Sequence, residues 1–320
     1  MLLRANRLPM LVGLLALVPF VATAPQAVAA PPHVHLRSFP IPTPNSQLEV
    51  ITPGPDGNLW FTEERTSKIA RITFKGKVTE FPTPTSGSPF DIVDGPDGNL
   101  WFTEGATGRI GQIKPDGRIR EIPFSVFDAA GGITAGPDGN IWFTQVTGNA
   151  VLRLDLSTMN LTSFPIPTPN SFPGAITAGP DGNLWFVEGA SGKIGRITPE
   201  GMITEPVSGL SSPFWITSRP DGNLWFTEPF NQRIGKVTPA GQVTFYTSDL
   251  HIASIASGLS QDLVFTDFSD NLFGTLSTDG VVTMTREISG SSPTGITTGP
   301  QGSIWFLGFS TNRVYRAVVR

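Results

Sequence analysis

The amino-acid sequence predicts an all-β protein, a seven-bladed β-propeller built from four-stranded antiparallel blades. A run reading Gly-Pro-Asp-Gly-Asn-Leu-Trp-Phe-Thr-Glu occupies residues 54–63 and 95–104, and close relatives of it begin at Gly136, Gly179, Arg219, Gly258 and Gly299. Equivalent positions of the seven copies lie 39 to 43 residues apart: Trp60, Trp101, Trp142, Trp185, Trp225, Val264 and Trp305. A period near forty residues, made of short strand-like runs, is typical of a propeller blade.

The first two strands of each repeat are joined by a tight turn. In the second repeat, residues 89–93 form a short run that ends at the Gly-Pro-Asp-Gly sequence of residues 95–98. Proline presets φ at the second turn position, and glycine accepts a positive φ. Residues 99–103 then form a strand with aromatic residues on both sides, which we expect where a neighbouring sheet covers each face.

The third and fourth strands are more polar. Residues 109–113 alternate polar and apolar side chains, and residues 114–117 form the next turn. Residues 118–123 alternate again, with charged side chains that face water and a proline that suits an outer edge. Each repeat therefore supplies one blade of four strands.

The two ends of the chain predict how the ring closes. Residues 312–318 form a third strand with no fourth strand after it, while residues 34–41 resemble an outer strand without a blade. The continuation of this segment is repeated almost letter for letter within residues 161–171. We therefore expect residues 34–41 to complete blade seven, within a single propeller domain of residues 30–320.

The first 29 residues have the composition of a secretion signal peptide. Arg4 and Arg7 precede an apolar core at residues 11–21, and Ala27-Val28-Ala29 forms a small-residue cleavage site. We expect cleavage near Ala29 and a secreted, extracytoplasmic protein. The chain has no cysteine, which excludes a lipid-anchored lipoprotein and a disulfide framework. No later segment is long and apolar enough for a membrane anchor.

The bulk charge limits the partners. A net charge of −4 disfavours nucleic acid, which binds basic surfaces. We expect a monomer whose partner is a small-molecule ligand or an extracellular protein.

Three motifs together resemble the virginiamycin B lyase (streptogramin lyase) family. They are the Gly-Pro-Asp-Gly-Asn-Leu-Trp-Phe-Thr-Glu run, Lys-Ile-Gly-Arg-Ile-Thr at residues 193–198 and Thr-Glu-Phe-Pro-Thr-Pro at residues 79–84. The resemblance covers about residues 34–320. It implies a similarly clasped seven-bladed propeller, and an enzyme that linearises a cyclic depsipeptide antibiotic by magnesium-assisted elimination.

The chain departs from this family at the residues that carry the chemistry. The family has histidines in the innermost strands of the last two blades, with a glutamate before the second one. Here Ala253 and Thr294 stand at the histidine positions, and Ser292 stands at the glutamate position. None of the three titrates near neutral pH, whereas elimination needs an acid and a base. The resemblance therefore implies the scaffold, with the antibiotic lyase activity lost.

The mouth of the central tunnel is the expected binding site. The first strand of every blade lines the tunnel, and departures from the repeat there include Phe90, Phe214, Trp215 and Thr294, which we predict to be ligand-binding residues. The alternative is that the aromatic side chains simply plug the tunnel. Glu49 and Asp91 lie in adjacent blades and form a candidate site for a divalent cation such as magnesium.

His251 is a further candidate because it is the only histidine within the ring and precedes an inner strand. Together with Glu49 it is a candidate acid or base, although a loop histidine can equally be a solvated surface residue. The recurring acids Glu63, Glu104, Glu188, Glu228 and Asp267 are expected to form solvated cross-strand pairs with basic residues.

Two functions remain open. One is ligand or partner binding at the tunnel mouth. The other is a divergent metal-assisted lyase that eliminates across a C–O bond, or a lactone hydrolase.

Overall fold

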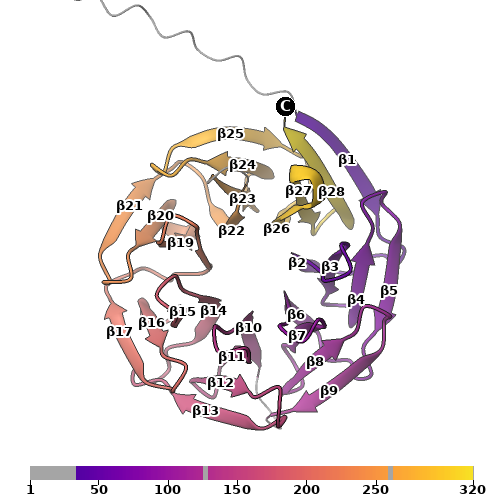
Figure 1. Cartoon of the computed structure of the whole chain (residues 1–320). Helices are drawn as coiled ribbons and strands as arrows, with labels where there is room; N and C mark the ends of the chain where they lie inside the picture. Colours follow the sequence, from indigo (N-terminus) through magenta and orange to yellow (C-terminus); the bar gives the residue numbers. More distant parts are fainter. Residues whose placement is uncertain (1–33, 125–128, 259–261, 320) are drawn as a thin grey trace, which may run out of the picture. The chain divides into compact units, whose positions relative to one another are not determined.

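The computed structural model describes residues 34–124, 129–258 and 262–319, within the compact unit Pro32–Arg320. The described residues form seven four-stranded antiparallel sheets that follow one another around a ring, as the sequence predicted (Figure 1). Six sheets are each built from four consecutive strands. The seventh joins the two ends of the described chain in the order β1-β28-β27-β26.

The strands run from the innermost to the outermost position in each blade. Blades one to three contain β2 (Leu48–Pro53), β3 (Leu59–Glu63), β4 (Lys68–Ile72) and β5 (Val78–Pro82); β6 (Pro89–Asp94), β7 (Leu100–Glu104), β8 (Arg109–Ile113) and β9 (Ile119–Pro123); and β10 (Ala130–Ala135), β11 (Ile141–Gln145), β12 (Ala150–Leu154) and β13 (Leu161–Pro165). Blades four and five contain β14 (Pro173–Ala178), β15 (Leu184–Glu188), β16 (Lys193–Ile197) and β17 (Ile203–Val207); and β18 (Ile216–Ser218), β19 (Leu224–Glu228), β20 (Arg233–Val237) and β21 (Val243–Thr247). Blade six contains β22 (Ile252–Ser257), β23 (Leu263–Asp267), β24 (Leu272–Leu276) and β25 (Val282–Glu287), and blade seven contains β26 (Pro293–Gly299), β27 (Ser303–Gly308), β28 (Arg313–Val319) and β1 (Val34–Pro40).

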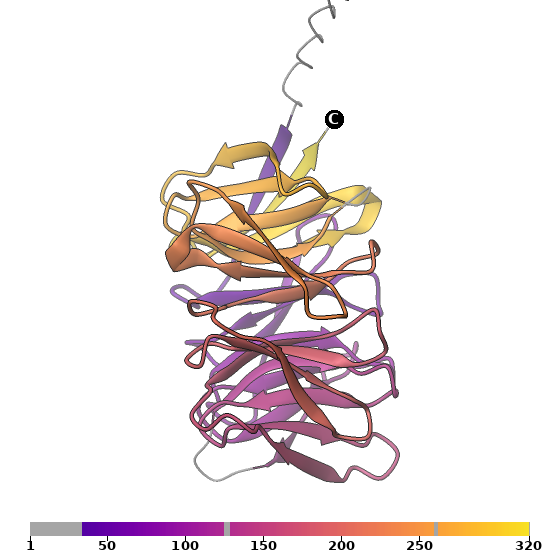
Figure 2. The same ribbon diagram turned by 90° about the vertical axis from the view of Figure 1, so that its left-hand side faces the viewer.

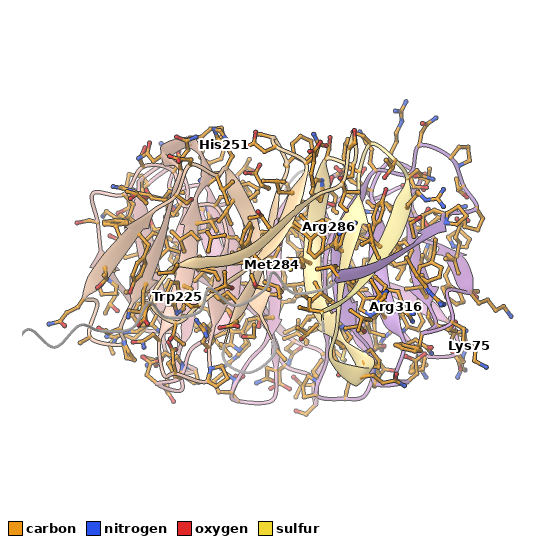
Figure 3. All side chains as sticks on the ribbon, turned by 90° about the horizontal axis from the view of Figure 1, so that it is seen from above. Lys75, Trp225, His251, Met284, Arg286 and Arg316 are labelled. Carbon is orange, nitrogen blue, oxygen red and sulfur yellow. The ribbon has the colours of Figure 1, made fainter. Side chains whose placement is uncertain are left out.

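The loops gather on the two faces of the ring, which Figure 2 shows from its side. The Gly-Pro-Asp-Gly turns lie on one face. We call the opposite face the mouth face; it carries the turns that follow the second strand of each blade. Figure 3 shows His251 at this face, whereas Lys75 lies toward the other. The short 3-10 turns η1 (Pro229–Asn231) and η2 (Pro300–Gly302) complete the described secondary structure. None of the described helical segments has the length and apolar character needed to cross a membrane.

A separate apolar cluster fills each space between neighbouring blades. The second strand of a blade presents its tryptophan to the following blade and its phenylalanine to the preceding one, so that Trp60 and Phe102 share one cluster and Trp101 and Phe143 share the next. These side chains are fully buried. Each large aromatic residue buries roughly 150–250 Å². The strand therefore stabilises two interfaces at once, which explains its aromatic residues on both sides.

Blade six has Val264 in place of the tryptophan and fills the space differently. Phe273 occupies a third-strand position that is isoleucine or valine in the other blades. Its ring stacks on Phe306 with centroids 4.6 Å apart, and Phe306 stacks in turn on Tyr315 at 5.0 Å. The divergence of blade six at this point is therefore a compensated change in the core.

A chain of threonine hydrogen bonds links neighbouring blades near the mouth face. The hydroxyl of Thr62 donates to the carbonyl oxygen of Phe90 at 2.9 Å, and Thr103 donates to Gly131 at 2.8 Å. Equivalent bonds are made by Thr144, Thr227 and Thr266. Blade four has Val187 at this position, so the described bond is missing between blades four and five.

Strand β1 closes the ring in the predicted way. It pairs with β28 in an antiparallel register from Val34 opposite Val319 to Pro40 opposite Arg313. The ring of Phe39 stacks on Trp305 at 5.8 Å, as Phe81 stacks on Trp60 at 5.5 Å within blade one. The N-terminal strand thus supplies the same aromatic contact as an outer strand from within the repeat.

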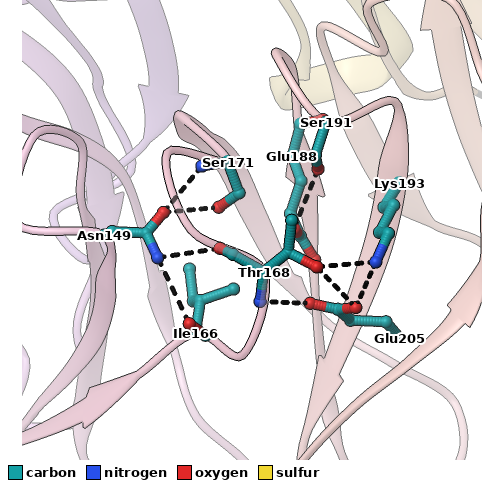
Figure 4. A network of polar contacts seen from close by, with 8 residues as sticks. All are labelled: Asn149, Ile166, Thr168, Ser171, Glu188, Ser191, Lys193 and Glu205. Atoms are coloured by element: carbon teal, nitrogen blue, oxygen red, sulfur yellow. Dashed lines mark hydrogen bonds and ion pairs between the residues drawn. The ribbon is translucent and has the colours of Figure 1, made fainter.

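The repeated Ile-Pro-Thr-Pro-Asn-Ser sequence forms the connection between two blades (Figure 4). Between blades three and four, Thr168 donates its N–H and hydroxyl to the two carboxylate oxygens of Glu205, at 3.0 and 2.8 Å. Lys193 donates to the same carboxylate at 2.5 Å. Thr43, Glu80 and Lys68 repeat this network after β1. The near-identical sequences therefore perform the same function, and the copy that contains Thr43 fastens blade seven to blade one.

Candidate functional site

The candidate site is a cavity of about 530 Å³ on the mouth face, which we call the mouth cavity. It lies over blades one, two, five, six and seven. The structure brings six of the predicted site residues together in its lining: Glu49, Phe90, Phe214, Trp215, His251 and Thr294. They meet because each lies at or near the start of an inner strand, and all these strands start at the same end of the tunnel.

Three further phenylalanines, which were not among the predicted site residues, line the mouth cavity. Phe268 and Phe309 pack edge to face with their ring centroids 5.9 Å apart, and Phe230 lies in η1 with 80% of its surface exposed. Each lies in the turn after the second strand of its blade. A comparison of the repeats at that turn would have revealed them, since Gly105 and Gly189 occupy the place of Phe268 and Phe309 in other blades.

Trp215 separates the central cavities. It lines the mouth cavity, a side cavity of about 360 Å³ over blades one to five, and a tunnel cavity of about 220 Å³. It also packs against the apolar clusters of three blade interfaces. The indole is therefore a wall of all three cavities, and both alternatives from the sequence, ligand binding and closure of the tunnel, stay predictions.

The inner strand of blade five is shortened to accommodate this arrangement. β18 begins only at Ile216, and the residues before it leave the regular ladder. The N–H of Phe214 donates to the carbonyl oxygen of Thr227 at 2.9 Å, and the N–H of Thr227 donates to Trp215 at 3.0 Å. Phe214 stays 49% exposed at the mouth, which leaves its ring available to a ligand.

Glu49 and Asp91 do not line the same cavity. Glu49 lines the mouth cavity, whereas Asp91 lines the tunnel cavity, because the two occupy successive positions of equivalent strands and alternate residues differ in direction. The carboxylate of Asp91 accepts N–H bonds from Ile92 and Ile133, at 2.8 and 3.0 Å. Burial raises the pKa of Asp91 to about 7. Asp91 thus joins blade two to blade three. A cation site shared by Glu49 and Asp91 stays a prediction, and the different cavities that these two residues line do not support it.

Glu49 has a second carboxyl group beside it. Burial, and then the charge of Glu64 and a hydrogen bond between the two side chains, raise the pKa of Glu49 to about 8. Glu64 lines the side cavity. The two carboxyl groups therefore lie where the mouth and side cavities adjoin.

His251 belongs to a cluster with two aspartates at the rim of the mouth cavity. Its Nδ1 lies 3.5 Å from Oδ2 of Asp270, and its backbone N–H donates to Asp267 at 2.7 Å. One potential ligand atom from each of the three residues lies within 4.8 Å of the others. Both oxygens of Asp267 already accept backbone N–H bonds, from His251 and Asp270, so this carboxylate holds the loop in place.

The acids that end the second strands are buried, and the prediction of solvated pairs was wrong. Glu63, Glu104, Glu188, Glu228 and Asp267 are all 0% exposed. Only Glu228 forms the expected ion pair, with Arg233. Lys68 and Lys193 instead bind the outer-strand residues Glu80 and Glu205, at 2.7 and 2.5 Å. The acids point beneath the mouth-face loops, where Thr66 and Ser191 donate hydroxyls to Glu63 and Glu188 at 3.0 Å.

The residues at the three diverged family positions do not fit a divalent cation. Ala253 has no donor atom, and the hydroxyl of Thr294 donates to the carbonyl oxygen of Leu48 at 2.7 Å. The hydroxyl of Ser292 accepts a hydrogen bond from Ser310 at 2.9 Å. Magnesium and calcium prefer carboxylate oxygens, and none is present at these positions. A metal-assisted step at this place would need other residues.

The comparisons with known proteins agree with the architecture. A streptogramin B lyase structure superposes with a TM-score of 0.85 and 30% identity, covering 90% of this chain and 98% of the other. A catalytically inactive histidine-to-alanine variant of virginiamycin B lyase from Staphylococcus aureus, solved with quinupristin, gives 0.84 and 31%, covering 90% and 100%.

A curated relative and a family profile add the sequence evidence. A virginiamycin B lyase from Bordetella parapertussis (strain 12822) is 38% identical over 60 residues, which span 18% of this chain and only 20% of that protein. The profile of the virginiamycin B lyase family matches residues 26–247 and 206–320. Because these matches extend through all seven blades, the chain belongs to the virginiamycin B lyase family.

Proposed function

We propose that this protein binds a largely apolar small molecule in the mouth cavity and does not carry out the antibiotic elimination of its relatives. The observation that carries the proposal is the aromatic lining, in which Phe90, Phe214, Trp215, Phe230, Phe268 and Phe309 surround one cavity of about 530 Å³. Ligand sites for small molecules typically have this size and this apolar, aromatic character.

The exposure of the rim supports binding over simple closure of the tunnel. Phe214, Phe230 and Phe268 are 49%, 80% and 42% exposed. Exposed aromatic groups gathered at a concave surface mark an interaction site, because leaving them in water costs free energy that a ligand would recover. The Staphylococcus aureus relative was solved with quinupristin, which makes this compound a suitable probe of the cavity.

Titration calorimetry with quinupristin as the probe tests the proposal. We expect binding to the wild-type protein, and at least a tenfold weaker affinity for Trp215→Ala, since a buried aromatic contact contributes about 1.5–3 kcal/mol. Met202→Ala is the control, because Met202 is 64% exposed on the opposite face. Equal affinities for Trp215→Ala and wild type would contradict a site in the mouth cavity.

A second candidate function is a divergent lyase or lactone hydrolase in the same cavity. Glu49 favours it, because a carboxyl group with a pKa of about 8 can hold a proton near neutral pH and release it during a reaction. His251 lines the same cavity and is the other candidate acid or base.

Mass spectrometry of quinupristin after incubation with the protein and magnesium distinguishes these activities. Elimination linearises the ring without changing its mass, and hydrolysis adds the mass of one water. Our proposal expects neither product. A product that forms with wild type, but not with Glu49→Gln or His251→Ala, would establish the enzyme in place of the binding protein.

A further inference from the structure

We propose that the mouth of the propeller selects ligands that carry an organic ammonium group, recognised by the Glu49 and Glu64 carboxyl groups and by the aromatic faces beside them. This inference rests on the proposed function, since it names the chemical class of the ligand that the mouth cavity binds. Four features of the described residues support it.

The first feature is the position of the two acids. Glu49 lines the mouth cavity and Glu64 lines the side cavity, while Phe90, Phe214 and Trp215 line both. The carboxyl pair therefore lies beside three aromatic rings at the junction of the two cavities. A cation bound there can contact carboxylates on one side and ring faces on the other, an arrangement that binds quaternary and protonated amines.

The second feature is the absence of a basic partner. Neither Glu49 nor Glu64 forms an ion pair with a basic side chain among the described residues. Other acids of the mouth face have such partners, as Glu80 has Lys68 and Glu228 has Arg233. Two carboxyl groups in contact repel one another when both are charged, and a bound cation would relieve this repulsion.

The third feature is the sign of charge over the whole mouth. The described residues that line the mouth and side cavities include no lysine or arginine. Their titratable members are Glu49, Glu64 and His251. Low-dielectric walls concentrate the field of the two acids in the cavity, so cations are attracted and anions are repelled.

The fourth feature is that both acids are departures from the repeat in one blade. Positions equivalent to Glu49 carry Phe90, Gly131, Gly174, Phe214, Ala253 and Thr294 in the other blades, and positions equivalent to Glu64 carry Gly105, Val146, Gly189, Pro229, Phe268 and Phe309. The blade scaffold does not need an acid at either place. The pair therefore has a local role at the mouth.

The experiment compares two ligands of the same shape. (1-Naphthylmethyl)trimethylammonium carries a permanent positive charge, and its neutral isostere has carbon in place of the quaternary nitrogen. Calorimetry or competition with a fluorescent ligand measures both. We expect the wild-type protein to bind the cation about tenfold tighter or more, since a partly desolvated cation–aromatic contact with a carboxylate contributes about 1–2 kcal/mol.

Variants assign the preference to the two acids. Glu49→Gln combined with Glu64→Gln should bring the affinity for the cation down to that for the neutral compound, both measured on the same variant. Each single substitution should remove part of the preference, which provides a second measurement if the double variant folds poorly. Glu200→Gln is the control, because Glu200 is an exposed acid in a turn on the opposite face.

The outcomes separate this inference from the proposed function. Equal affinity of wild type for both ligands, or a preference that persists in the double variant, would overturn the ammonium selectivity but leave an apolar binding site. If neither ligand bound, or if Trp215→Ala bound both as well as wild type, the mouth cavity would not be the binding site and both proposals would fail.

Discussion

Arg219 illustrates how one residue can break a local pattern. Four blades have an aspartate in the Gly-Pro-Asp-Gly turn that accepts a hydrogen bond from the indole N–H, as Asp56 does from Trp60 at 2.9 Å. The first glycine makes room for this, since a Cβ on Gly54 would lie 2.3 Å from the indole of Trp60. Arg219 replaces that glycine in blade five, and the indole N–H of Trp225 has no partner.

We predict that Arg219→Gly stabilises the protein. Arg219 is 3% exposed, and none of its guanidinium nitrogens has a hydrogen-bond partner. Burial lowers its pKa, which reflects the cost of the unpaired charge. Glycine should let Trp225 reach Asp221 and should raise the free energy of unfolding by about 1 kcal/mol, after the loss of the arginine contact with the indole face.

Urea denaturation of the two proteins measures this difference. Gly95→Arg is the matched control in blade two, where the new Cβ would lie 2.5 Å from the indole of Trp101 and should destabilise the fold. An Arg219→Gly variant less stable than wild type would show that the arginine contact outweighs the indole hydrogen bond.

Strands are joined across blades by single hydroxyl groups, and this predicts the effect of exchanging threonine and valine. Val187 leaves blades four and five without the described bond. Val187→Thr should add a hydroxyl that donates to the carbonyl oxygen of Phe214, stabilising the fold by about 1 kcal/mol. The reverse exchange, Thr103→Val, removes bonds to Gly131 and Asp91 and should cost about 1–3 kcal/mol.

The shift in thermal midpoint of each variant, followed by circular dichroism, tests both exchanges. Opposite signs are expected for the two. If Val187→Thr lowered the midpoint, the geometry between β15 and the residues before β18 would not permit the bond, in line with the shortened inner strand of blade five.

Strand β1 should determine whether the ring stays closed. A chain that begins at Thr43 lacks the partner of β28 and the ring that stacks on Trp305. It should lose roughly 3 kcal/mol or more, and the exposed edge should promote association. Thermal denaturation and size-exclusion chromatography measure the two effects. A chain that begins at Val34 should behave like the longer protein, and a Thr43 chain of equal stability would refute the role of the clasp.

Buried carboxyl groups govern the pH dependence of the whole molecule. Burial raises the pKa of Glu63, Asp91 and Glu104 to about 7 and that of Glu49 to about 8. The folded state therefore keeps protons that the unfolded chain releases above about pH 4.5. Since the folded state binds more protons in this window, stability must fall as pH rises from about 5 to 8.

The opposite effect limits stability in acid. Lys68 and the loop threonine lower the pKa of Glu80, and an equivalent pair lowers that of Glu205. Their contribution is lost as pH falls below about 4. We therefore expect the highest thermal midpoint near pH 5, measured by scanning calorimetry, and a flatter profile for Glu104→Gln. A midpoint that rises from pH 5 to 8 would contradict the claim that burial disfavours the charged form of these acids.

Some properties that the sequence predicts stay untested, and others depend on contacts between residues far apart in sequence. The signal peptide of residues 1–29 lies outside the described residues and stays a prediction, as do secretion and the monomeric state. The buried acids were misjudged because pairing in sequence register does not reveal which side chain a loop covers. The turn phenylalanines Phe230, Phe268 and Phe309 depart from the repeat in sequence, but only the closed ring shows that their three turns meet at one cavity.

The sequence by itself determined the number of blades, the position of each strand and the closure by β1, because these depend on a repeated local pattern of turn residues and apolar side chains. It also located the inner-strand residues of the mouth. Only the tertiary structure decided which of them share a cavity: Glu49 joined the aromatic wall, and Asp91 turned into the tunnel. Ring closure brings seven separate strand ends to one axis, and no pattern within a single blade specifies the contacts made there.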